Sequence, residues 1–79
     1  MIRLKVKEIA QRKNLSQSRL GRLADIDQGT MRRIFNDPAP NITLETLNRL
    51  ARALRMHPAD LIEYEPDPLR EEGFISERD

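Results

Sequence analysis

The residues whose side chains are best suited to bind a ligand are the polar residues between positions 28 and 36. Gln28 has a side-chain amide that both donates and accepts hydrogen bonds, which matches the major-groove edge of adenine. Arg32 and Arg33 carry guanidinium groups that can bind guanine bidentately or bind a phosphate. Gly29 has no side chain, so its backbone can approach a base edge closely. These types at helical spacing predict a helix that contacts nucleic acid, although each is also common on a solvated helix.

Other chemistries lack the residues that they need. The sequence contains no cysteine and one histidine, His57, which has no partners at a spacing typical of a metal site or a catalytic triad. The three glycines are scattered and make no phosphate-binding loop. We therefore expect no catalytic residue, no metal, no cofactor, no small-molecule substrate and no enzyme activity.

Two short helices joined by a tight turn are predicted to position the polar residues. Ser16 is a good N-cap for a helix over residues 17–24, and Asp27 can cap a second helix over residues 28–36. Apolar residues at helical spacing predict one buried face on each helix. They are Leu20, Leu23 and Ala24 on the first helix, and Met31 and Ile34 on the second.

Further helices are predicted on both sides of this pair. A helix over about residues 5–13 ends at Asn14, which can adopt left-handed backbone, and the alternation of Ile2-Arg3-Leu4 suggests a short strand before it. Thr43 caps a later helix, and His57 caps a fifth helix that has Pro58 at its first position. The helix after Thr43 has one continuous apolar face, made of Leu44, Leu47, Leu50, Ala51 and Leu54.

The segment Ser16–Asn36 resembles the Cro/repressor (XRE-type, lambda-repressor-like) helix-turn-helix family. That family's pattern runs Ser-Gln-x-x-Leu-Ala, then a Gly-Val turn, then a recognition helix that ends near Asn-Gly; the match continues over Ile42–Leu61, so the resemblance covers residues 5–64. It implies an all-α, five-helix DNA-binding domain in which residues 28–36 enter the major groove.

Four positions depart from the family pattern: Gly21 replaces Ala, Asp25 replaces the turn Gly, Phe35 replaces a polar residue, and Asp37 replaces the Gly after Asn36. Aspartate tolerates left-handed backbone at some cost, so we expect both turns to form. Gly21 weakens its helix by roughly 1 kcal/mol relative to Ala, but it permits a close helix crossing.

The resemblance and the chemistry together give two sets of candidate DNA contacts. Those expected to reach bases are Gln28, Gly29, Arg32 and Arg33. Those expected to reach phosphates are Gln17, Arg19, Thr30 and Asn36, with Asn36 alternatively only ending its helix.

Charge is distributed unevenly along a chain whose length suits one domain. Residues 1–36 hold nine Lys/Arg against three acids, whereas residues 64–79 hold two Arg against six acids. We expect a DNA-binding domain over residues 1–65 and an acidic tail over residues 66–79. Neither a long apolar run nor a secretion leader appears, which makes a soluble cytoplasmic protein the expectation.

These patterns lead to a sequence-specific double-stranded DNA-binding protein that regulates transcription, most simply as a repressor. The alternative is an antitoxin or adaptor that uses the same fold to bind a protein partner; exposed Gln28, Arg32 and Arg33 favour the DNA function. We also expect a homodimer, because one short helix reads few base pairs. Two terminal segments are candidates for its contact, Ile2-Arg3-Leu4 and Gly73-Phe74-Ile75-Ser76.

Overall fold

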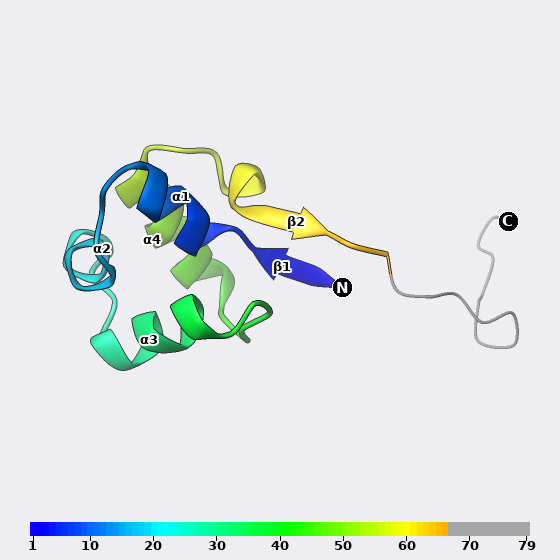
Figure 1. The fold of residues 1–79 in the computed structure, drawn as a ribbon, viewed down its shortest axis with the longest axis horizontal. Coiled ribbons are helices and arrows are strands. Elements are labelled where there is room, and N and C mark those ends of the chain that lie inside the picture. The colour runs from blue at the N-terminus through cyan, green and yellow to red at the C-terminus, as the bar shows by residue number, and fades with distance from the viewer. Residues whose placement is uncertain (67–79) are drawn as a thin grey trace, which may run out of the picture.

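The computed structural model describes residues 1–66, which fold into a small helical unit with a two-stranded antiparallel sheet at one end (Figure 1). The described elements are β1 (Ile2–Leu4), α1 (Val6–Arg12), α2 (Gln17–Ala24), α3 (Gln28–Asn36), α4 (Leu44–Leu54), the 3₁₀ helix η1 (Pro58–Leu61) and β2 (Ile62–Tyr64). The predicted all-α helix-turn-helix class and the short N-terminal strand are thus confirmed.

Each of the last three α-helices starts directly after the residue whose side chain was expected to cap it. Ser16 Oγ accepts a hydrogen bond from the backbone N–H of Arg19 at 3.1 Å. Thr43 Oγ1 accepts from the N–H of Thr46, also at 3.1 Å. These bonds satisfy N–H groups that have no partner inside the helix, which is why the helices begin where they do. Asp27 caps α3 in the same way, and His57 caps η1.

Left-handed backbone occurs one or two residues after the end of α1, α2 and α4, and none of these residues is glycine. Asn14 and Asp25 have φ of 59° and Arg55 has φ of 58°. Asp37, in contrast, has φ −110° and ψ 118°, so the left-handed geometry considered for it is not used. The reason is local, because Pro38 disfavours helical backbone at the residue before it. Asp37 instead accepts a hydrogen bond from the N–H of Ala39 through Oδ1.

The core lies where α2 packs against α3 and α4. Its largest fully buried side chains are Val6, Leu20, Met31, Leu50, Leu54 and Leu61. Two leucines expected on the buried faces lie outside this core: Leu23 is 57% exposed and Leu44 is 83% exposed. Both leucines instead lie at the surface, where Leu44 lines a hollow with Ile2 and Leu47.

The fifth predicted helix is reduced to the single 3₁₀ turn η1, because the chain becomes extended at Ile62 (φ −116°, ψ 154°). The strand β2 that follows pairs with β1 in the register Ile2↔Tyr64, Arg3↔Glu63 and Leu4↔Ile62. Arg3 Nη2 also forms an ion pair with Glu63 Oε1 at 3.1 Å. The N-terminal strand therefore finds its partner within its own chain, while the other terminal segment named above, residues 73–76, lies outside the described residues.

Candidate nucleic-acid interface

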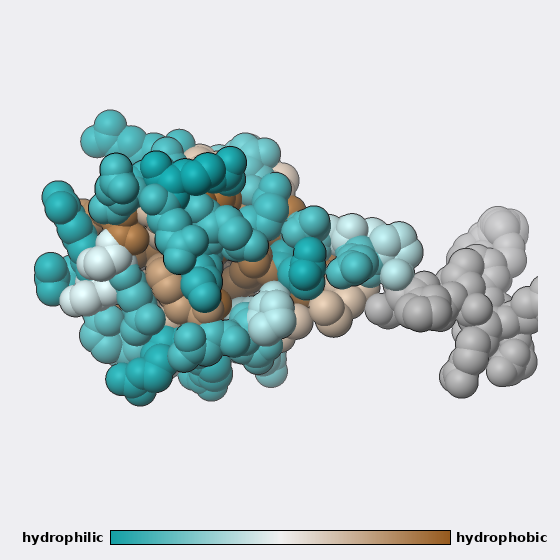
Figure 2. Space-filling view, viewed as in Figure 1, coloured by the Kyte–Doolittle hydropathy of each residue, from teal (hydrophilic) through white to brown (hydrophobic). Residues whose placement is uncertain are grey.

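The outward face of α3 consists of one glycine and of residues with charged or hydrogen-bonding side chains. Gly29, Arg32, Arg33 and Asn36 are all exposed, whereas Met31 and Ile34 on the opposite side are buried. Seen as in Figure 1, hydrophilic side chains cover the outer side of α3, and hydrophobic surface lies between α3 and α1 (Figure 2). Three of the four predicted base-contacting residues therefore share one solvent-facing surface.

Gln28, the fourth of these residues, is placed differently. It is half-buried at the first position of α3, and its Nε2 donates a hydrogen bond to the backbone carbonyl oxygen of Ser18 at 3.3 Å. Its amide thus lies against α2 at the edge of the exposed face. Sequence reasoning gave no sign of this contact, because it depends on how α2 and α3 cross.

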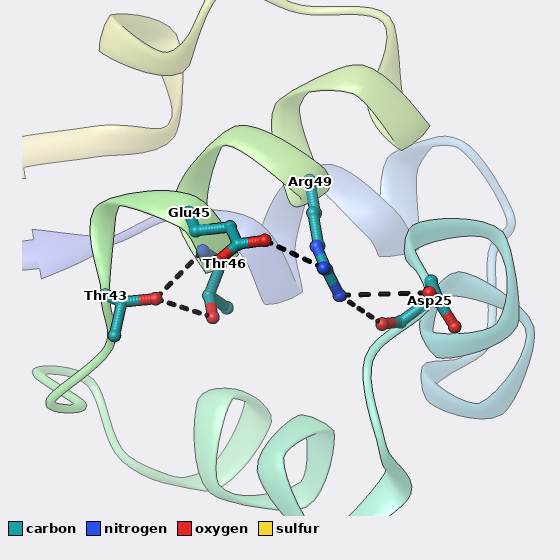
Figure 3. Close-up of polar contacts among 5 residues, drawn as sticks. All are labelled: Asp25, Thr43, Glu45, Thr46 and Arg49. Carbon is teal, nitrogen blue, oxygen red and sulfur yellow. Dashed lines mark hydrogen bonds and ion pairs between the residues drawn. The ribbon is translucent and has the colours of Figure 1, made fainter.

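Arg49 of α4 forms a hydrogen bond with the turn between α2 and α3 (Figure 3). Its Nη1 donates to the carbonyl oxygen of Asp25 at 2.9 Å, and its Nη2 pairs with Glu45 Oε2 at 2.8 Å. At the start of α4, Oγ1 of Thr43 donates a hydrogen bond to Oγ1 of Thr46 and accepts one from the backbone N–H of Thr46. Arg49 therefore links α4 to the turn that leads into α3.

A family model, described as the Cro/C1-type HTH DNA-binding domain, matches residues 5–67. The chain belongs to this family. The match spans all the helices and β2 but not β1, and it confirms the resemblance seen in the sequence. A comparison with curated proteins gives no match. Membership makes the chain a DNA-binding domain of the kind that binds specific sequences and regulates transcription.

Two phosphate candidates of this HTH domain lie at the start of α2, and the other two lie in α3. Gln17 is half-buried at the first position of α2, and Arg19 is exposed one residue beyond Ser18. Because Ser16 caps only the N–H of Arg19, the N–H groups of Gln17 and Ser18 have no hydrogen bond among the described residues. Free N–H groups at a helix start attract phosphate, and Arg19 adds positive charge beside them.

Thr30 is already engaged within the domain. Its hydroxyl donates to Asp27 Oδ1 at 2.7 Å, and its backbone N–H donates to Oδ2 of the same carboxylate at 2.9 Å. These two bonds, the hydroxyl first, lower the pKa of the Asp27 carboxyl below its usual value. A phosphate would have to compete with Asp27 for the hydroxyl hydrogen of Thr30. Asn36, at the other end of α3, is exposed and open to contact.

Within the described part of this HTH domain, no group of three or more His, Cys, Asp or Glu side chains is arranged to hold a metal ion. A search of the helices in residues 1–66 finds none that is both long and apolar enough to span a membrane.

Proposed function

We propose that the protein binds specific double-stranded DNA with α3 in the major groove and acts as a transcriptional repressor. The observation that carries the proposal is the outward face of α3, where Arg32 and Arg33 lie one helical turn beyond Gly29. Gly29 has no side chain, so the start of the helix can come close to base edges, while the guanidinium groups on the next turn can reach guanine. Repression then follows from occupancy of operator DNA that polymerase needs.

Phosphate contacts supply most of the affinity in this arrangement. Gln17 and Arg19 at the start of α2 bind DNA phosphates on one side of the groove, and Asn36 at the end of α3 binds a phosphate farther along the DNA. Such contacts fix the position of the domain on DNA without reading sequence. Specificity is left to the side chains of α3.

The experiment that tests this proposal is selection of binding sites from a random DNA pool at stated salt, followed by competition binding. Replacing Arg32 or Arg33 with Ala should weaken binding to the preferred site by roughly 1–3 kcal/mol and relax preference at one or two base pairs. Arg52→Ala is the matched control, since Arg52 is also an exposed arginine but lies on α4. Equal losses on every sequence would show that Arg32 and Arg33 touch only phosphate.

The repressor role has a separate test. A reporter promoter that carries the selected site should be transcribed less when the wild-type protein is present. The variant in which both Arg32 and Arg33 are Ala should restore transcription. A reporter that the wild-type protein activates would contradict repression while leaving DNA binding intact.

We further propose that the protein acts as a homodimer on two half-sites about 10 base pairs apart. The supporting surface is the sheet end of the domain. There, a hollow of about 280 Å³ is lined almost wholly by apolar side chains: Ile2, Leu4, Pro40, Ile42, Thr43, Leu44, Leu47 and Ile62. The exposed side chains of Ile2, Leu44 and Tyr64 adjoin or line it. Because two half-sites are bound by two protomers, we infer that a second copy of the chain packs against this hollow.

The edge of β2 adds a backbone argument for this dimer. Met1 and Glu65 exchange backbone hydrogen bonds, so the alternation of an antiparallel pair places the N–H groups of Ile62 and Tyr64 on the outer edge. The described residues give that edge no partner, whereas on β1 the N–H of Leu4 is bonded to Pro38. An open strand edge beside apolar side chains favours pairing with the same edge of another copy.

A further inference from the structure

Gly21 lies at the point where α2 meets the start of α3, and the space that a side chain would need there is already filled. A Cβ on Gly21 would lie 2.6 Å from Nε2 of Gln28 and 2.8 Å from Cγ of Met31. Both distances are shorter than real Cβ contacts, so an alanine would force these side chains to move. The amide of Gln28 is the more easily displaced, because it is the far end of a flexible side chain.

The absence of that Cβ allows the amide of Gln28 to reach α2. A carbonyl oxygen such as that of Ser18 can only accept a hydrogen bond, so the NH₂ group of Gln28 must face it. The other branch of the amide, Oε1, then points away from Ser18. The contact thus fixes which end of the Gln28 amide is offered to the outside.

We propose that Gly21 is a specificity-determining residue that acts by positioning Gln28, so that α3 reads adenine and rejects guanine at one base pair. This inference rests on the proposed function. The outward Oε1 accepts a hydrogen bond from N6 of adenine, and the second hydrogen of Nε2 can donate to N7. Guanine offers two acceptors, N7 and O6, which oppose the outward oxygen. A Gln28 released from Ser18 can turn its amide over and loses this discrimination.

The first test examines the free wild-type protein. Nuclear Overhauser contacts should connect the side-chain amide protons of Gln28 with the Hα protons of Gly21. The amide of Gln28 should also differ in shift from the exposed amide of Gln11, which serves as the reference. A Gln28 amide without contacts to Gly21 overturns the inference, with no variant that has to fold.

The second test measures base discrimination in the full chain. The wild-type protein, Gly21→Ala, Gln28→Ala and the double variant compete for the selected site and for versions with each base replaced. Thermal melting confirms that each variant is folded. Gly21→Ala and Gln28→Ala should each reduce the preference for adenine over guanine by roughly 5- to 100-fold, at the same base pair. The double variant should match Gln28→Ala alone.

Three results would contradict the inference: a folded Gly21→Ala protein with wild-type discrimination, a loss of affinity that is equal on all sequences, or a further loss of discrimination when Gly21→Ala is added to Gln28→Ala. A random pool that yields no preferred sequence would contradict the proposed function. A wild-type preference for adenine that Gly21→Ala leaves intact would contradict only the role of Gly21.

Discussion

Arg49 of α4 donates through Nη1 to the backbone carbonyl oxygen of Asp25, 2.9 Å away, at the residue where α2 ends and the turn begins (Figure 3). The same nitrogen lies 3.8 Å from Oδ2 of Asp25. Asp25 holds left-handed backbone, which is unfavourable for a residue with a side chain. Arg49 thus binds the residue with left-handed backbone in the turn between α2 and α3.

Replacing Arg49 with Ala should destabilise the domain by about 1 kcal/mol, since a charge-assisted hydrogen bond is lost at a partly exposed site. The measurement is urea unfolding followed by circular dichroism. Arg52→Ala, which removes an exposed arginine from the same helix, should change the free energy of unfolding much less. An equal loss of unfolding free energy in the two variants would mean that Arg49 stabilises the domain only through its charge and not through its hydrogen bond to Asp25.

Local signals in the sequence predicted most of the helical frame, for a physical reason. Caps such as Ser16 and Thr43 act on N–H groups within the next three residues, so their effect can be read from neighbouring positions. The bounds of α2 and α3 accordingly agree with the ranges expected for them. The break at Asn14 has the same local origin.

The parts that were not predicted depend on contacts between distant residues. The strand over Ile62–Tyr64 was not predicted, because it forms by pairing with β1, and its residue Ile62 lies opposite Leu4. The bond from Arg49 to Asp25 spans 24 positions, and an arginine on a polar helix face gives no sign of it. In the candidate site, the outward face of α3 followed from periodicity, whereas the amide of Gln28 turns toward Ser18 across the space beside Gly21, a contact between two helices.

The contribution of Asp27 to stability should depend on pH. Hydrogen bonds from Thr30 lower its pKa in the folded protein, so the unfolded chain binds more protons in the acidic range. The stabilisation is therefore present above the ordinary carboxyl value of 3.8 and is lost as the pH falls through the lowered value. Unfolding of the wild-type protein and Asp27→Asn should differ at neutral pH, and the difference should shrink in acid.

A second variant isolates the cause of this shift. Thr30→Val removes the hydroxyl that donates to Oδ1 but keeps the backbone N–H that donates to Oδ2. The pKa of Asp27, followed by NMR titration of its carboxyl, should rise toward 3.8 in that variant. An unchanged pKa would show that the backbone bond alone is responsible.

Salt dependence should separate phosphate contacts from base contacts. Affinity should fall linearly with salt on logarithmic axes, with a slope near −0.9 for each phosphate neutralised. Arg19→Ala, at the start of α2, should reduce the steepness of that slope by about 1 and weaken binding to all sequences alike. Sequence-dependent losses for Arg19→Ala would move this residue from the phosphate contacts to the base contacts.

The last prediction concerns the dimer. Leu44→Asp should make the protein monomeric, because it places a charge beside the apolar hollow next to β2. The monomer should keep its stability, since Leu44 is 83% exposed and an acidic residue is favourable in the first turn of α4. Sedimentation equilibrium measures the oligomeric state of the variant.

The control is Leu23→Asp, which places a charge at another exposed leucine away from the hollow and should leave the protein dimeric. The Leu44 variant should also bind two half-sites with less cooperativity than the wild-type protein. A wild-type monomer at concentrations that saturate DNA would contradict the dimer, and a dimeric Leu44→Asp would place the interface elsewhere.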